Sequence, residues 1–400
     1  MGGFIEVLSQ LLAPEMLLAA FAGGAFAAAI GALPAFVFTG ILVIGGEAAV
    51  ATGGPDDITG AIAFGPPFSP AISFAGGAAA AAFAARKGYM ATGFPFHEAK
   101  NIAAAQGPKP DVMVVGGLFG IVGYWLVESS VALSLPWDPI AMGVVLSALA
   151  HRLVLGYPLV GLVRYGILDM TPFERGEVRR AAGVGGRAGA GVSAAQALDE
   201  ETPEAGVDEV GTREGTGEAD AAPAEGGDAP GGDGEAGKEP GGEAKRRFVV
   251  EPWLPHQYLW GQVATLGGVA GLFGAFVALA SGSAFLPFGI SAASLLFLNC
   301  GVARFPVTHH MTLPAATAAL AVSESGSGLL ADVGMAGAMM VGAVFGLVGA
   351  LVAELFQRVF FAHGDTHWDP PAAAIVFGTF LVVVCYVGGI FPDPAWVPVP

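Results

Sequence analysis

Ten apolar stretches, each close to the length of a membrane-spanning helix, divide the chain. A spanning helix needs about 20 apolar residues, with roughly 17 to 25 tolerated. Five stretches lie before residue 164 and five after residue 257, and we place them at residues 16–33, 35–53, 60–86, 112–135, 139–163, 258–281, 285–303, 306–323, 332–357 and 370–392. The pattern predicts an all-α, polytopic membrane protein with about ten transmembrane helices.

Proline sets two of these boundaries. A single helix from Glu15 to Ala51 would be roughly 55 Å long at 1.5 Å per residue, which is longer than a membrane requires. We therefore divide this block at Pro34, and Pro287 divides a second long block in the same way.

The two sets of five stretches share sequence features in the same order. GLFGIVGYWLVE (117–128) aligns with AVFGLVGALVAE (343–354), and the next stretch in each half is entered through Asp-Pro, at 138–139 and 369–370. GPPFSPAISFAGGAAAAAF (65–83) occupies the place of THHMTLPAATAALAV (308–322). Matches in register favour an internal duplication. Because five crossings per half is an odd number, the sequence predicts two inverted five-helix repeats.

Composition and charge agree with this division. Hydrophobic residues make up 54% of the chain and charged residues 13%, whereas soluble domains carry about 25% charged residues, so a simple soluble enzyme is excluded. Residues 193–243 hold 15 acidic and two basic residues of a chain whose net charge is -17. We predict a disordered acidic linker at 166–250 between repeats at 1–165 and 251–400.

The acidic sign of the linker argues against a nucleic-acid partner, because phosphate contact needs Lys and Arg. Basic residues in short loops stay cytoplasmic, and most of them fall on the linker side. We therefore expect a multi-pass protein of the cell membrane with its N-terminus outside, the linker cytoplasmic and the C-terminus outside. Glu6 stands where a signal peptide would be basic, so we expect no cleaved signal.

Proline-rich breaks in the third and eighth stretches are the first candidate site. Because proline removes a backbone N–H, residues 65–70 should unwind before a helix near Ala71, and residues 309–314 before a helix near Pro314. Such helix starts suit an anionic or dipolar ligand. The predicted ligand-binding residues are Pro66, Pro67, Ser69, His309, His310 and Thr312. The alternative is two kinks satisfied by neighbouring helices.

Charged residues inside apolar stretches are candidates for coupling to protons or cations, because charge at membrane depth is costly. The predicted coupling residues are Glu47, Glu128, Arg152 and Glu354. The structural alternatives are that Glu354 pairs with Arg358 one helical turn away and that Arg152 reaches the interface.

Histidines give a weaker metal hypothesis. His363, Asp365 and His367 carry zinc or iron ligands, but their spacing matches no metal signature. His309 and His310 could instead take part in a proton path. We predict no cofactor, while a bound proton, cation or metal stays open.

The sequence thus predicts a permease that moves a small polar or anionic solute by alternating access. An intramembrane metalloenzyme and a passive channel are the alternatives. The sequence has no phosphate-binding loop of the ATPase type. The expected partners are the lipid bilayer and the solute, and association between copies of the chain is left open.

Overall fold

The computed structural model describes residues 9, 11–54, 58–90, 98–161, 163, 166–180, 246–248 and 250–400. Contacts within the chain define one compact unit, Met1–Val184 with Arg246–Pro400, and a second unit, Gly185–Lys245. All described residues belong to the first unit. The core of the predicted acidic linker lies outside them.

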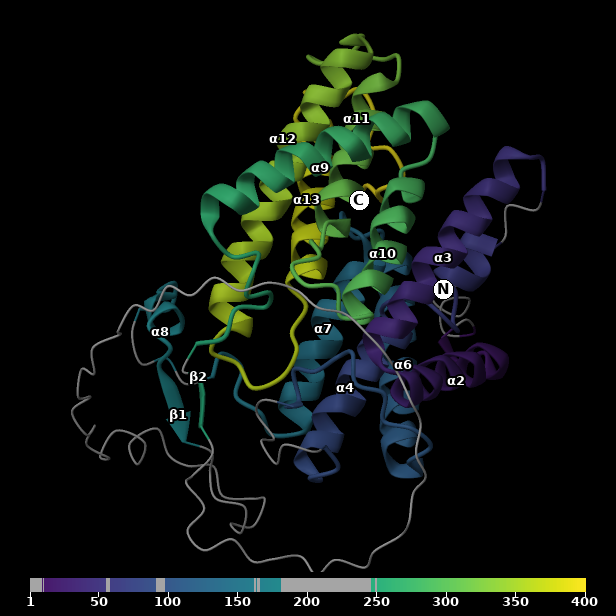
Figure 1. The fold of residues 1–400 in the computed structure, drawn as a ribbon. Coiled ribbons are helices and arrows are strands. Elements are labelled where there is room, and N and C mark those ends of the chain that lie inside the picture. Colours follow the sequence, from purple (N-terminus) through teal and green to yellow (C-terminus); the bar gives the residue numbers. More distant parts are fainter. Residues whose placement is uncertain are drawn as a thin grey trace, which may run out of the picture. The chain divides into compact units, whose positions relative to one another are not determined.

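Each of the ten apolar stretches contains a helix (Figure 1). The helices of the N-terminal half are α2 (Pro14–Ile30), α3 (Ala32–Ala51), α4 (Ser73–Arg86), α6 (Pro110–Ala132) and α7 (Pro139–Val154). Those of the C-terminal half are α9 (Trp260–Ser281), α10 (Phe285–Asn299), α11 (His309–Ser323), α12 (Gly334–Phe356) and α13 (Pro370–Val387). The π-helical turns η1 (Ile58–Ala63) and η2 (Gln357–Phe361) precede α4 and extend α12.

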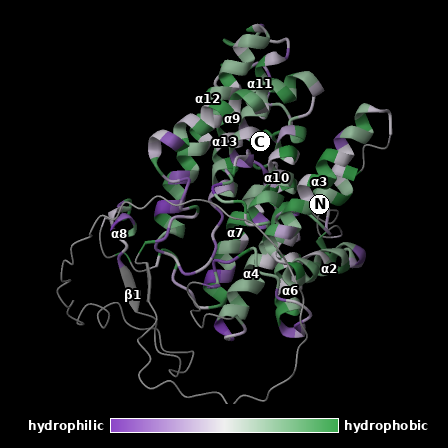
Figure 2. Ribbon diagram, viewed as in Figure 1, coloured by the Kyte–Doolittle hydropathy of each residue, from purple (hydrophilic) through white to green (hydrophobic). Residues whose placement is uncertain are grey.

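Five of these helices are long and apolar enough to cross a membrane: α3, α6, α9, α12 with its extension, and α13. Helices α2, α7 and α10 are apolar but have 17, 16 and 15 residues. Figure 2 shows that apolar residues cover most helices, and large side chains such as Phe38, Phe273 and Val344 are exposed on them. Exposed apolar surface on this scale fits contact with lipid. Ten full crossings and their directions stay predictions.

Glycine, more than proline, divides the two long apolar blocks. Helix α2 ends before Gly31, whose φ of 100° is a conformation that favours glycine, and Pro34 sits in the first turn of α3, where its missing N–H is tolerated. Gly282, with φ of 73°, ends α9, and Pro287 lies in the first turn of α10. The predicted separations are confirmed, with the breaks a few residues earlier.

The third and eighth stretches differ from each other more than their sequences suggest. Residues 64–72 are irregular and α4 begins at Ser73, close to the predicted start. Helix α11 instead begins at His309 and contains Pro314 in its interior, so the predicted unwinding over 309–314 is wrong. Space explains the difference: the Pro314 ring packs against Gly378 of α13, where no side chain opposes it.

Helices α4 and α11 are buried on nearly every side. Twelve of the 14 residues of α4 and 13 of the 15 residues of α11 are buried. Both are rich in alanine, which lets surrounding backbones approach closely. At 1.5 Å per residue each spans only about 21 to 23 Å, less than the roughly 30 Å hydrocarbon core.

The two halves pack their helices in the same pattern. Helices α2, α4 and α6 contact one another, as do α9, α11 and α12. Helix α7 packs on α4 and α6, and α13 packs on α11 and α12. Across the halves, α3 contacts α10 and α7 contacts α13. Each of these four helices therefore contacts the helix at the equivalent position in the other half.

The described residues at the two ends of the predicted linker form short elements of secondary structure. Helix α8 (Thr171–Glu174) and strand β1 (Val178–Arg180) follow the first half, and β1 pairs antiparallel with β2 (Arg246–Phe248). The backbone before α8 is held by the second half, because Arg358 and His363 bond to the carbonyls of Leu168 and Ile167, each at 2.9 Å.

Replacing Gly40 by alanine should destabilise the contact between α3 and α10. A Cβ at Gly40 would meet the backbone of Ala292 and Ala293, which cannot move aside like a side chain. We expect the free energy of unfolding to fall by about 1 to 3 kcal/mol, measured as a lower Tm of the solubilised protein. Gly45→Ala in the same helix is the control, since a Cβ there meets nothing within 4 Å; equal losses in both variants would contradict this packing.

Candidate functional site

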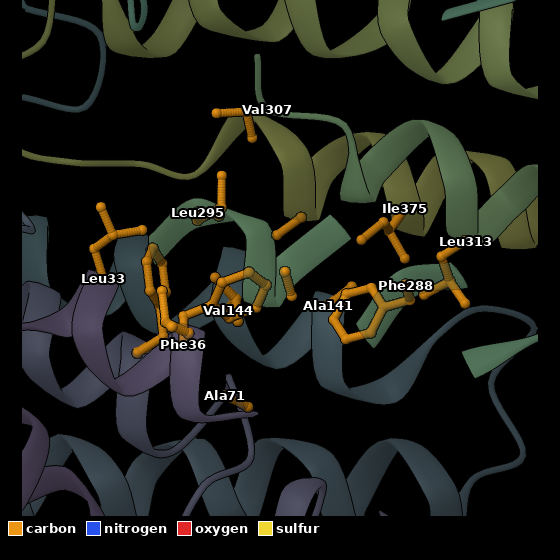
Figure 3. Packing of buried hydrophobic residues seen from close by; sticks show 14 of the residues in the cluster. Leu33, Phe36, Ala71, Ala141, Val144, Phe288, Leu295, Val307, Leu313 and Ile375 are labelled. Atoms are coloured by element: carbon orange, nitrogen blue, oxygen red, sulfur yellow. The ribbon is translucent and has the colours of Figure 1, made fainter. Parts of the chain in front are cut away.

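A cavity of about 590 Å³ lies between the helices of the two halves. Most of its wall is apolar or aromatic. Figure 3 shows the buried hydrophobic cluster that supplies part of this lining, with Phe36, Ala141, Phe288 and Ile375 among the labelled side chains. The volume is typical of sites that hold a small organic molecule.

Three pairs of helices line the cavity with residues at matching spacing. Helices α3 and α10 each contribute a pair of residues three apart, and α10 adds Leu295 and Leu298. Helices α7 and α13 each contribute the N-cap aspartate and the residues three and six further on, and the segments around the starts of α4 and α11 contribute residues four apart. The matched residues are Leu33 and Phe36 with Phe285 and Phe288; Asp138, Ala141 and Val144 with Asp369, Ala372 and Ile375; and Pro70 and Phe74 with His309 and Leu313.

The two aspartates cap the helices that they begin. Asp138 Oδ1 accepts hydrogen bonds from the backbone N–H groups of Ile140 and Ala141, at 2.8 and 3.1 Å. Asp369 Oδ2 accepts from the N–H of Ala372 at 2.8 Å. Both aspartates are buried residues. Each therefore brings a carboxylate to the cavity wall while satisfying a helix start.

Two histidines add polar atoms to the same wall. His367 Nε2 lies 3.1 Å from Asp369 Oδ1. The centre of the His309 ring lies 4.8 Å from the centre of the Phe36 ring. The Nδ1 atoms of both rings are buried and have no hydrogen-bonding partner among the described residues. Unpaired polar atoms beside a cavity are candidates for contact with a ligand.

Lys100 is the basic side chain of the described cavity wall. It forms a 3.2 Å ion pair with Glu251, and its ammonium lies 4.8 Å from the centre of the Phe361 ring. This ion pair joins the segment before α6 to the segment before α9. It therefore connects the two halves beside the cavity.

The predicted ligand-binding residues are only partly brought together. Of the six, His309 lines the cavity. The backbone of Pro66 and Pro67 packs against Gly23 of α2. Ser69, next to the wall residue Pro70, is buried, and its hydroxyl has no hydrogen-bonding partner in the part of the chain that the structure describes. His310 packs against Trp253 of the segment before α9, and Thr312 bonds to Ser291 of α10 at 3.2 Å. The irregular segment before α4 and the first residue of α11 meet at one cavity, through Pro70 and His309.

The predicted coupling carboxylates lie away from the cavity wall. Glu47 accepts a hydrogen bond from Thr59 at 2.9 Å. Glu354 is buried and accepts from Arg358 at 2.6 Å and from Gln357 at 3.0 Å, which is the structural alternative of a pair within one helix. Glu128 is half-buried in α6, next to the wall residue Val127.

Arg152 fastens α7 to the loop before α13. Its guanidinium is fully buried and donates to the Thr366 hydroxyl at 2.9 Å, to the carbonyls of Thr366 and Phe360 at 2.8 Å each, and to the carbonyl of Leu159. It also lies 4.9 Å from the Trp368 ring centre. The buried guanidinium is satisfied in place by the carbonyl oxygens of Leu159, Phe360 and Thr366, and its side chain does not extend to the protein surface.

The three weak metal candidates do not converge. His363 Nε2 lies 2.9 Å from the carbonyl oxygen of Ile167, whereas His367 pairs with Asp369. Within the described ranges, no group of three or more His, Cys, Asp or Glu side chains could hold a metal ion. His97, another histidine of the sequence, lies outside those ranges.

Sequence reasoning missed most of the cavity wall. Asp138 and Asp369 were visible as matched helix entries, and their place beside the breaks could have marked them as site residues. Lys100, Trp253 and Trp396 come from loops and a chain end, and no local pattern indicates that such segments share a wall.

Comparison with known proteins adds a family. A family model described as a family of unknown function (DUF7973) matches residues 6–205 and 206–400. The chain belongs to this family. No curated protein and no solved structure matches the DUF7973 chain.

Replacing Arg152 by lysine should destabilise this DUF7973 protein although the charge is kept. Lysine lacks the planar fork that reaches several acceptors at once, so carbonyls of the loop before α13 would lose their donors. We expect the free energy of unfolding to fall by about 3 kcal/mol, measured by thermal unfolding. Arg175→Lys, at an exposed ion pair, should change it by less than about 0.5 kcal/mol; the same small change at Arg152 would contradict the role given to it.

Proposed function

We propose that the protein is an integral membrane permease that moves a small amphipathic solute by alternating access, with the cavity as its solute site. The observation that carries the proposal is the matched lining, in which corresponding helices of the two halves contribute residues at the same spacing. A site to which corresponding helices of two halves contribute can be exposed alternately by rocking one half against the other.

The helix packing supports two related repeats. In a pair of structures related by a twofold axis, the elements nearest the axis touch their own counterparts. The contacts of α3 with α10 and of α7 with α13 fit this rule. The inverted orientation, with both termini outside and the linker in the cytoplasm, remains part of the proposal.

The lining favours an amphipathic solute over the small polar solute expected from the sequence. Leucine, isoleucine, valine and aromatic residues make up most of the wall, with polar side chains at a few places. A small hydrophilic solute would lose its hydration without sufficient replacement. A solute with an apolar body and one polar group matches both parts of the wall.

Coupling to a proton or cation is also proposed, with a smaller set of residues than the sequence suggested. Glu47, Arg152 and Glu354 each form hydrogen bonds with other side chains of the protein, which gives them a structural role. Glu128 stays a candidate because it is a half-buried carboxylate in α6, for which no hydrogen bond to another of the described residues accounts. The metalloenzyme alternative has no observation in its favour.

Alternating access predicts reciprocal labelling of the cavity from the two sides of the membrane. The test uses the substitution Ala141→Cys in a protein whose Cys300 and Cys385 are replaced by serine. An impermeant maleimide is added to right-side-out or to inside-out vesicles, and the rate at which it labels position 141 is measured from each side. Glu251→Gln weakens the ion pair with Lys100. We expect it to raise the labelling rate from the side bearing the Lys100 segment by about tenfold or less and to lower the rate from the other side.

A labelling rate that rises from one side and falls from the other distinguishes a carrier from a channel and from a sealed bundle. A channel would be labelled faster from one side without slower labelling from the other, and a sealed bundle would not be labelled from either. Either result would contradict the proposed mechanism. Glu174→Gln, at an exposed position outside the cavity wall, is the matched control and should leave both rates unchanged.

A further inference from the structure

We propose that the cavity recognises a lipophilic organic cation, a molecule with one positive charge and an aromatic or branched apolar body. This inference rests on the proposed function, because it takes the cavity as the solute site. It adds the sign of the charge, which the sequence left as polar or anionic.

The balance of charge on the wall carries the first step. The wall contains two carboxylates, Asp138 and Asp369, and one basic side chain besides histidine, Lys100. The ammonium of Lys100 is already paired with Glu251 at 3.2 Å. An anion entering the cavity would compete with this carboxylate, whereas a cation would meet an excess of negative charge in a low-dielectric surrounding.

The helix starts at the wall do not reverse this balance. The positive ends of α7 and α13 would attract an anion, but the protein supplies its own anions there, Asp138 and Asp369, as N-caps. Asp138 uses Oδ1 for both amides, and its Oδ2 accepts no hydrogen bond within the described residues. One carboxylate oxygen is thus left for a ligand.

Aromatic rings provide the second step. The centre of the Phe36 ring lies 5.8 Å from the centre of the Phe74 ring and 5.9 Å from that of the Phe288 ring. All three residues line the cavity. Farther along the wall, Phe285 packs 5.0 Å from Trp396. Aromatic faces attract cations, and they do so more strongly when water is excluded.

Histidine provides an independent third step. His309 and His367 are each at least nine-tenths buried, and their Nδ1 atoms lack a partner among the described residues. A neutral imidazole nitrogen can accept a hydrogen bond from a ligand. A protonated amine offers such donors, and a carboxylate does not.

The test compares two ions of the same shape and opposite charge, tetraphenylphosphonium and tetraphenylborate. Binding of each to the full-length protein in lipid nanodiscs would be measured by titration calorimetry. We expect the phosphonium to bind and Asp138→Asn to weaken its binding by at least about tenfold. Asparagine caps a helix as well as aspartate does, so this variant removes the charge and keeps the helix start.

A matched control uses an aspartate outside the cavity. Asp169 also accepts from an N–H two residues ahead, that of Thr171 at 3.0 Å, and the hydroxyl of Thr171 lowers the pKa of the Asp169 carboxyl. Asp169→Asn should leave both affinities unchanged. Subtracting variant from wild type cancels the partition of each ion into lipid.

The outcomes separate this inference from the proposed function. Tighter binding of the borate, or phosphonium binding that Asp138→Asn leaves unchanged, would overturn the cation inference and leave the cavity as a solute site. Binding of neither ion, or binding that persists when Ala141→Trp fills the cavity, would overturn the solute site itself. Phosphonium binding lost in both Asp138→Asn and Ala141→Trp would support both.

Discussion

One requirement governs this structure: where a helix begins inside the protein, its polar backbone must be surrounded by other parts of the protein or by an internal cavity. Polar backbone at membrane depth is tolerated only where protein or an internal cavity surrounds it. Helices α4 and α11 are too short to span a hydrocarbon core, and each is enclosed by its own half. Their small residues permit that enclosure. Their starts then face the cavity with Pro70 and His309.

The same constraint explains why the cavity has carboxylates in an apolar wall. Helices α7 and α13 also begin there, and each start leaves backbone N–H groups without partners. Asp138 and Asp369 satisfy these groups directly. A carboxylate that is required for a helix to begin is held in place by the fold, so it can also face a ligand at little additional cost.

Periodicity and caps predicted much of this architecture, but not the wall. The ten apolar stretches and both Asp-Pro entries could be predicted because they are local properties. The start of α11 could not, since Pro314 is accommodated by Gly378, which is distant in sequence. Arg152 was ambiguous for the same reason: its acceptors lie in a loop of the other half. Burial that depends on tertiary neighbours leaves no periodic pattern.

The contacts between the halves also limit how a carrier could move. The N–H of Asp138 donates to Thr379 of α13 at 3.0 Å, and Arg152 at the other end of α7 holds the loop before α13. Helices α7 and α13 are thus fastened to each other by polar bonds. Helices α3 and α10 instead meet through small residues at Gly40 and Ala292. Any rocking of the halves that preserves these bonds would pivot about α7 and α13 and open where α3 leaves α10.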